Sequence, residues 1–152
     1  MSDLTLPEIS EKMRDIDFAV LTTRSDGGAL AGRPMSNNRE VEFDGDAFFF
    51  TCGDTRTVGD IERDPQVSLA YQGKSGMLGM KPLFIAVEGR AELIRDKGEF
   101  AEHWTKDLDA WFKQGIDTPG LTLIKVKAER LHYWDGFSEG EVKLDKEALA
   151  RG

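Results

Sequence analysis

Cysteine, histidine and long apolar runs are scarce in this sequence of 152 residues. Cysteine occurs once, at Cys52, which excludes an internal disulfide and indicates a reducing compartment. No apolar run is long enough to cross a bilayer, and the first residues lack the basic start and apolar stretch of a secretory signal. These absences predict a soluble, cytoplasmic protein that does not contact a membrane.

Positive charge is also in deficit, because 20 lysines and arginines stand against 28 acidic residues, for a net charge of −8. Such a field repels a phosphate backbone, so nucleic acid is not expected as a partner. A small phosphorylated ligand would need a few basic side chains gathered into a local positive pocket. The two histidines, His103 and His132, lie far apart with no other ligand at metal-binding spacing, so no metal site is predicted.

Short apolar runs separated by Gly, Asp and Asn turns make up most of the chain. They predict strands over 18–23, 30–36, 40–43, 47–51, 67–71, 83–94, 121–126 and 130–134, with a bend or bulge at Gly89 and a flexible loop over 73–79. Helices are predicted from a capping box at Thr5 and Glu8, from a cap at Asp54 or Thr55 to about Asp64, and over 96–112. The last of these carries the apolar stripe Phe100, Trp104, Leu108 and Trp111.

Many short strands with few helices predict a mainly β (α+β) barrel, and the length suits one domain over residues 1–137. Residues 138–152 hold four acids and three bases, and we expect them to form a charged, flexible C-terminal tail.

A family resemblance rests on five motifs in order: Arg33-Pro34-Met35-Ser36, Phe48-Phe49-Phe50-Thr51, Thr55-Arg56-Thr57, Pro65-Gln66-Val67-Ser68-Leu69 preceded by Ile61, and Val87-Glu88-Gly89-Arg90-Ala91-Glu92-Leu93. With these motifs the sequence resembles the pyridoxamine 5'-phosphate oxidase-like, FMN-binding split-barrel family. The short chain and the Tyr133-Trp134-Asp135 ending are most similar to its bacterial general stress protein branch. The resemblance implies a six-stranded antiparallel split β-barrel, a homodimer, and FMN bound at the dimer interface.

The resemblance also implies which residues hold the flavin. Arg33 matches the strand arginine that pairs with the FMN phosphate, and Arg56 and Thr57 match the helix start that holds the same group. The backbone of the family's counterparts of Pro34 and Met35 lies against the ring. The candidate cofactor-binding residues are Arg33, Pro34, Met35, Ser36, Phe50, Thr51, Arg56, Thr57 and Trp134, the last of which would contact the partner's flavin.

Elementary chemistry supports the phosphate pocket independently. A phosphate dianion favours arginines and the unbonded N–H groups of a helix N-terminus, and Arg56 opens a predicted helix that Arg33 approaches from a strand. Pro34 lacks an N–H group, so we expect it on an edge strand or where the ladder of hydrogen bonds is interrupted. Oxidases of the family usually carry lysine where this chain has Thr57, which weakens phosphate binding and leaves FMN, FAD and a deazaflavin as alternatives.

Three functions stay open from the sequence. The chain is a flavin-dependent oxidoreductase, or a non-enzymatic flavin store or redox sensor, or a pyridoxamine or pyridoxine 5'-phosphate oxidase-like enzyme. Arg130 and His132 match a substrate-holding pair of the vitamin B6 oxidases and share one face of a predicted strand. The last function is disfavoured because this chain ends soon after that pair. A small barrel has little room inside for the flavin ring, so a second subunit is expected to cover it.

Overall fold

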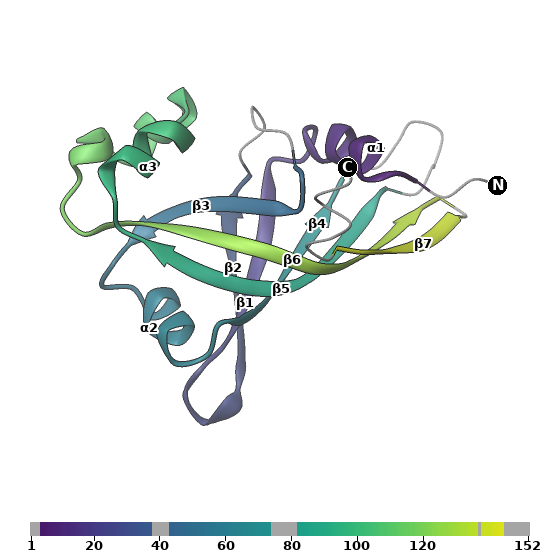
Figure 1. Ribbon diagram of the computed structural model, residues 1–152, viewed down its shortest axis with the longest axis horizontal. Coiled ribbons are helices and arrows are strands. Elements are labelled where there is room, and N and C mark those ends of the chain that lie inside the picture. The colour runs from purple at the N-terminus through teal and green to yellow at the C-terminus, as the bar shows by residue number, and fades with distance from the viewer. Residues whose placement is uncertain (1–3, 38–42, 74–81, 137, 145–152) are drawn as a thin grey trace.

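The computed structural model describes residues 4–37, 43–73, 82–136 and 138–144. Within these ranges the chain forms seven strands: β1 (Phe18–Arg24), β2 (Leu30–Ser36), β3 (Asp46–Cys52), β4 (Gln66–Gln72), β5 (Phe84–Ile94), β6 (Leu121–Asp135) and β7 (Ser138–Lys143). The α-helices of the described ranges are α1 (Leu6–Met13), α2 (Arg56–Arg63) and α3 (Lys97–His103). Figure 1 shows their arrangement around one curved sheet.

The sheet is antiparallel throughout its described pairings. Six strands follow one path in the order β2-β1-β4-β5-β6-β3, and β7 pairs with β6. The path curls into a half-open barrel (Figure 1), and β2 and β3 are the two ends of this path. We call the place where these two ends face each other, without pairing among the described residues, the split. The predicted mainly β (α+β) split barrel with six strands and accessory helices is confirmed, and β7 is an addition to it.

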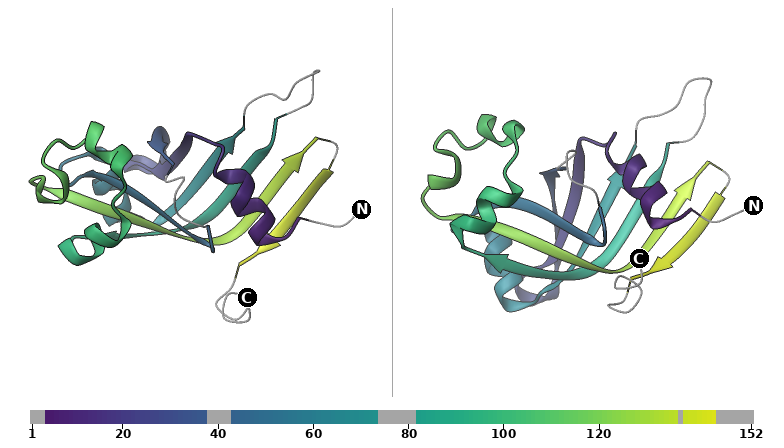
Figure 2. Two further views of the ribbon diagram at one scale, coloured as in Figure 1. Left: turned by 90° about the horizontal axis from the view of Figure 1, so that it is seen from above. Right: turned by 45° about the horizontal axis from the view of Figure 1, so that its top comes forward.

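The core lies on the inner face of this sheet, because successive side chains of a strand point to opposite faces. Leu21, Leu69, Val87 and Leu131 are consecutive cross-strand partners in one buried row, each at most 1% exposed. Helix α1 packs against this core through Ile9 and Met13 (Figure 2).

Helix α1 begins where the sequence predicts. Thr5 Oγ1 accepts a hydrogen bond from the Glu8 N–H (3.3 Å), the first of the two bonds of a capping box, and it donates to Glu8 Oε1 (2.9 Å), so Thr5 caps the helix. Pro7 lies in the first turn, where a missing N–H group costs nothing.

A β-bulge at Gly89 bends β5 and β6 together. Glu88 pairs with Arg130 and Gly89 pairs with Ala128, so Glu129 is the extra residue on β6. A Cβ atom at Gly89 would overlap the carbonyl oxygen of Lys127, which explains why glycine stands there. The predicted bulge is confirmed. It also corrects the prediction of two strands over 121–126 and 130–134, because the extra residue bends a single strand without ending it.

The predicted helix over 96–112 is wrong beyond His103. Trp104 and Thr105 take extended conformations, and a 3₁₀ helix follows at Lys106–Ala110. The turn places the Trp104 indole 5.0 Å from the Phe50 ring, and Trp104 Nε1 donates to Asp109 Oδ1 at 3.0 Å. Packing against β3 therefore overrides the helical stripe, and Trp111, which the stripe places in the core, is 65% exposed.

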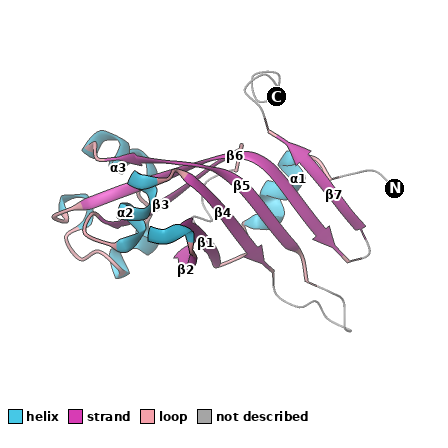
Figure 3. Cartoon of the chain, turned by 90° about the horizontal axis from the view of Figure 1, so that it is seen from below, coloured by secondary structure: helices cyan, strands magenta, loops and turns pink. Residues whose placement is uncertain are grey.

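The predicted tail is also wrong for its first residues. Ser138–Lys143 form β7, which pairs with Arg130–Asp135 of β6 (Figure 3). Gly140 lies over the Tyr133 ring, where a Cβ atom would collide with that ring. Residues 145–152, the rest of the predicted tail, lie outside the described residues.

Two other predictions fall partly outside the described ranges. These are the strand over 40–43, of which Phe43 alone is described and is buried outside any strand, and the loop over 73–79, of which Gly73 alone is described. Across the described ranges, none of the helices combines the length and the apolar character needed to span a bilayer.

Candidate functional site

Two of the predicted phosphate-binding arginines lie at the split between β2 and β3. Arg33 projects from β2, and its Nη1 donates to Thr23 Oγ1 (2.7 Å) and to the Leu21 carbonyl (3.3 Å). Arg56 is the first residue of α2, the helix that follows β3, and its Nη2 donates to Ser25 Oγ at 2.8 Å. The structure thus brings together two arginines that are 23 residues apart in the sequence.

The carboxylate of Asp60 lies at the centre of this cluster and is fully buried. Asp60 Oδ2 accepts hydrogen bonds from Thr23 Oγ1 and Ser25 Oγ, both at 2.8 Å, and lies 3.6 Å from Arg33 Nη2. Asp60 Oδ1 accepts from Arg63 Nη2 at 2.8 Å. We call Asp60, Thr23, Ser25, Arg33 and Arg56 the arginine cradle.

The contacts within the cradle shift the pKa values of Asp60 and Arg33. Burial alone would raise the pKa of Asp60, but the hydrogen bonds from Thr23 and Ser25 and the charges of Arg56 and Arg63 outweigh it, so this pKa is lowered. Burial lowers the pKa of Arg33, the charge of Arg56 lowers it further, and Asp60 opposes both effects. Asp60 is therefore ionised, and the two arginines lie close enough to repel each other.

Local sequence explains why α2 begins beside the split. Thr55 has an extended backbone, and its Oγ1 accepts a hydrogen bond from the Val58 N–H at 3.4 Å, so Thr55 is the cap and Asp54 is not. Thr55 Oγ1 also donates to the Cys52 carbonyl at 2.9 Å, which fixes the helix start to the end of β3. The N–H groups of Arg56 and Thr57 belong to the first turn of α2, which has no acceptors within the helix.

The cradle fits a phosphate group. Arg56 is exposed, and the Arg33 side chain is 20% exposed, so both have guanidinium surface facing solvent. An arginine has five N–H donors, more than the contacts described above occupy. A dianion between these two side chains would also meet the positive end of the α2 dipole.

Other predicted site residues line the same split farther along. Ser36 of β2 and Phe50 of β3 line one small hollow of about 20 Å³, together with side chains of the segment after α3. Phe50 packs edge-on against Phe100 and Trp104. Thr51 precedes the chain reversal into α2 and is half-buried.

Pro34 and Trp134 lie on the outer face of the sheet. Strand β2 is an end of the strand path, so the prediction that Pro34 lies on an edge strand is confirmed. Pro34 begins a row of apolar partners that continues through Val20, Ala70 and Ala86. Trp134 stacks on His132 with ring centroids 4.2 Å apart. We call the set of Phe18, Val20, Pro34, Ala70, Phe84, Ala86 and Trp134 the outer apolar face.

Four large side chains of this face are exposed to solvent: Phe18 (53%), Val20 (44%), Phe84 (40%) and Trp134 (38%). Contiguous exposed apolar surface of this kind marks a contact surface in soluble proteins. Trp134 lies at the far end of the face from β2, and is not joined to the arginine cradle by any contact among the described residues. The roles of the nine predicted residues toward a cofactor stay predictions.

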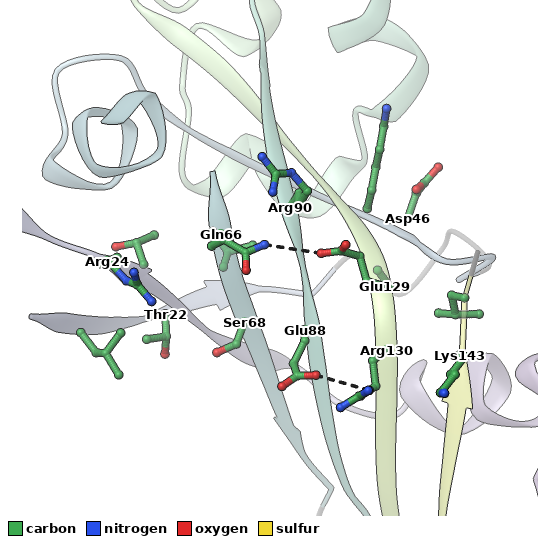
Figure 4. Close-up of a pocket in the computed structure, with 16 residues that line it drawn as sticks. Thr22, Arg24, Asp46, Gln66, Ser68, Glu88, Arg90, Glu129, Arg130 and Lys143 are labelled. Atoms are coloured by element: carbon green, nitrogen blue, oxygen red, sulfur yellow. Dashed lines mark hydrogen bonds and ion pairs between the residues drawn. The ribbon is translucent and has the colours of Figure 1, made fainter. Parts of the chain in front are cut away.

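A separate groove of about 1140 Å³ lies on the same outer face and contains none of the nine predicted residues. Figure 4 shows its floor, where Thr22, Ser68, Glu88, Arg130 and Lys143 cross the sheet as one row. The groove is open and charged with both signs. Of the arginine cradle only Thr23 lines it, and neither Arg33 nor Arg56 does, so its size does not make it the candidate site.

Arg130 and His132, which match the substrate-holding pair of the vitamin B6 oxidases, are both engaged by carboxylates. Arg130 Nε lies 2.7 Å from Glu141 Oε1 and 3.8 Å from Glu88 Oε2, and His132 Nε2 lies 2.7 Å from Glu139 Oε1. A substrate phosphate at Arg130 or His132 would face these carboxylates. Strand β7 supplies two of these carboxylates, Glu139 and Glu141, and they disfavour a vitamin B6 oxidase-like function.

One group of possible metal ligands occurs in the described part of the chain. Carboxylate oxygens of Glu99 and Glu102 and a ring nitrogen of His103 lie within 4.8 Å of one another on α3. Glu102 is exposed, and the His103 ring stacks on Phe48 at 3.8 Å. Acidic surface groups commonly occur together without a metal, and the predicted absence of a metal site stays a prediction.

Sequence reasoning missed the centre of the site. Asp60, Thr23 and Ser25 were not among the predicted residues, although each is at most 5% exposed. A signal was present for Asp60, because Thr57, Asp60 and Ile61 share the helical spacing that carries the buried face of α2. A charged residue on a buried helix face needs partners, and two arginines stand within reach of it.

Comparisons with known proteins agree with this architecture. A structure from Clostridium acetobutylicum, described as a protein related to general stress protein 26 of B. subtilis (pyridoxinephosphate oxidase family), matches with a TM-score of 0.77 at 17% identity over 95% of this chain and 96% of the other. General Stress Protein 26 from Bacillus anthracis matches with a TM-score of 0.70 at 21% identity, over 90% of this chain and 98% of the other. A heme binding protein from Mycobacterium smegmatis matches with a TM-score of 0.72 at 18% identity, over 99% of this chain and 62% of the other.

The TM-scores establish a shared fold, and at these identities they show the fold alone. No curated protein sequence matches the chain. The sequence model of one family, described as pyridoxamine 5'-phosphate oxidase like, matches residues 5–149, which include every described strand and helix. The split barrel and this match together place the chain in the pyridoxamine 5'-phosphate oxidase-like family.

Proposed function

We propose that this protein binds FMN in the split between β2 and β3, as a homodimer of the general stress protein type. The observation that carries the proposal is the convergence of Arg33 and Arg56 at the start of α2, a positive site in a chain of net charge −8. The neighbours with the general stress protein 26 description share the fold and support the same type.

The residues of the cradle have definite tasks in this proposal. Arg33 and Arg56 bind the phosphate through charge-assisted hydrogen bonds, and the first N–H groups of α2 add to them. In this proposal Met35, Ser36, Phe50 and Thr51 would contact the ribityl chain and the ring, and the support for it is the hollow that Ser36 and Phe50 share. The cradle offers donors for one phosphate, which favours FMN over FAD.

The flavin when bound supplies hydride or electron transfer, and the protein supplies its position and electrostatics. We propose a flavin-dependent oxidoreductase, with a non-enzymatic flavin store or redox sensor as the alternative. The vitamin B6 oxidase-like activity is disfavoured, because carboxylates of β5 and β7 engage Arg130 and His132. Turnover of a reduced nicotinamide with an added electron acceptor separates the oxidoreductase from the store.

The first test is a titration of the flavin-free protein with FMN, FAD and riboflavin, followed by flavin fluorescence. We expect FMN to bind most tightly, and each of Arg33→Ala and Arg56→Ala to weaken FMN by about tenfold or more while leaving riboflavin unchanged. Arg24→Ala is the matched control, since Arg24 is an exposed arginine of β1 that pairs with Asp64 outside the cradle.

Equal affinity for FMN and riboflavin in the wild-type protein would remove the phosphate cradle from the proposal. Absence of any flavin binding would refute the proposal and turn the search to a deazaflavin or haem, the latter because of the heme binding neighbour.

A further inference from the structure

Asp60 stands out among the described residues as a fully buried carboxylate surrounded by donors from three elements. Thr23 Oγ1 and Ser25 Oγ come from β1 and the turn that follows it, Arg33 comes from β2, and Arg63 comes from α2 itself. The flavin proposal above assigns Asp60 no task, although it touches both phosphate-directed arginines directly or through one hydroxyl.

The protons of the two hydroxyls determine the direction of every bond in this cluster. An ionised carboxylate only accepts hydrogen bonds, so Thr23 and Ser25 each donate their single hydroxyl proton to Asp60 Oδ2. Their oxygen lone pairs then remain for the arginines. Thr23 Oγ1 accepts from Arg33 Nη1 at 2.7 Å, and Ser25 Oγ accepts from Arg56 Nη2 at 2.8 Å.

Exposure to solvent increases along these bonds from Asp60 to the two arginines. Asp60 is fully buried, whereas the Arg33 side chain is 20% exposed and Arg56 is exposed. The carboxylate therefore lies behind the guanidinium groups, and a ligand arriving from solvent meets the arginines first.

We propose that Asp60 is a positioning residue of the flavin site, which orients Arg33 through Thr23 and Arg56 through Ser25 so that both guanidinium groups face one phosphate. This inference rests on the proposed function for its ligand. It assigns roles to Asp60, Thr23 and Ser25, which the family resemblance left without one, and it makes Thr23 and Ser25 two separable arms of one device.

The test removes each arm alone. Thr23→Val keeps the shape of the side chain and removes the bond between Arg33 Nη1 and Thr23 Oγ1, while Arg33 keeps its contacts with the Leu21 carbonyl and Asp60. Ser25→Ala removes the bond between Arg56 Nη2 and Ser25 Oγ. We expect each variant to weaken FMN by about tenfold and to leave riboflavin affinity unchanged, because the lost bonds act on the phosphate end only. Thr22→Val is the control, since Thr22 neighbours Thr23 on the opposite face of β1. Parallel loss of FMN and riboflavin would mean a general structural role and would overturn the proposal.

A double-mutant cycle sharpens the assignment. Ser25→Ala should have no further effect on FMN when Arg56 is already alanine, and should keep its full effect in the Arg33→Ala background. Thr23→Val should show the converse pattern. Additive effects in all four combinations would overturn the two-arm arrangement.

A measurement without ligand separates this proposal from the flavin proposal. In the flavin-free protein, NMR signals of the Arg33 and Arg56 guanidinium groups should show slowed rotation of their Nη groups. Ser25→Ala should speed the rotation of the Arg56 Nη groups only, and Thr23→Val should speed that of the Arg33 Nη groups only. If both arginines rotate freely in the wild-type protein, the positioning role fails whatever the protein binds. If each variant changes the rotation of its own arginine alone and no flavin binds, the flavin proposal fails, while the positioning role of Asp60 is supported.

Discussion

At the scale of single residues, Asp60 carries more of the site's organisation than either arginine that the sequence predicted. A buried charge without partners is strongly unfavourable, and Asp60 avoids that cost with hydroxyl and guanidinium donors. The same bonds tie the turn after β1 to α2, so the residue that orients the cradle also joins two elements. Its contribution to stability therefore depends on its charge.

The lowered pKa of Asp60 makes a pH prediction. Because the folded pKa lies below the ordinary value of 3.8, the carboxylate stabilises the fold at neutral pH, and this stabilisation is lost as the pH falls through the folded pKa. Asp60→Asn should lower the free energy of unfolding by about 3 kcal/mol at pH 7, and by less at a pH well below 3.8. Urea unfolding of both proteins at the two pH values checks this, and a gap that does not change with pH would contradict it.

At the scale of elements, the β5–β6 pair shows how one glycine allows a long strand to curve. The bulge at Gly89 and Glu129 lets β6 run unbroken from Leu121 to Asp135, where its last residues pair with β7. Strand β7 in turn places Glu139 and Glu141 against His132 and Arg130. The β-bulge thus lets β6 reach β7, whose carboxylates engage Arg130 and His132.

Two glycines should respond to alanine in opposite directions. At Gly89 the new Cβ would overlap the Lys127 carbonyl, part of the backbone, so Gly89→Ala should destabilise the fold by about 1–3 kcal/mol. Gly59 lies inside α2 with no atom within 4 Å of a new Cβ, so Gly59→Ala should stabilise it by up to about 1 kcal/mol. Thermal unfolding of the two variants makes the comparison, and a stable Gly89→Ala protein would argue against the bulge.

At the scale of the whole molecule, the outer apolar face is the feature that a single subunit leaves unexplained. It presents Phe18, Val20, Phe84 and Trp134 to solvent on the face opposite the core. A two-fold dimer would bury this face against its own copy, and it would bring the Trp134 of one subunit toward the other subunit.

Charge placed on this face should separate the subunits. Val20→Asp would bury a carboxylate without a partner in the dimer, so we expect it to yield monomers by size-exclusion chromatography with light scattering. Trp111→Asp is the control, because Trp111 is 65% exposed outside the outer apolar face. A wild-type protein that is monomeric, or a Val20→Asp protein that stays dimeric, would contradict the assignment of this face.

Local interactions explain what the sequence by itself determined. Caps at Thr5 and Thr55, glycine turns and period-two alternation act over a few residues, and from them the starts of α1 and α2, most strands and the barrel class follow correctly. The ordered motifs correctly indicated the family. Arg33 and Arg56 each bond a hydroxyl that donates to Asp60, and their role toward a phosphate stays a prediction.

Only the tertiary structure decided the rest, because it depends on contacts between distant segments. Packing of Trp104 on Phe50 ended α3 early, and pairing with β6 made a strand of Ser138–Lys143, whose polar composition predicted a tail. Asp60 became the centre of the site because folding brought Thr23 and Ser25 to it from 37 and 35 residues away, respectively. A buried carboxylate needs donors, and the sequence alone does not show which distant side chains supply them.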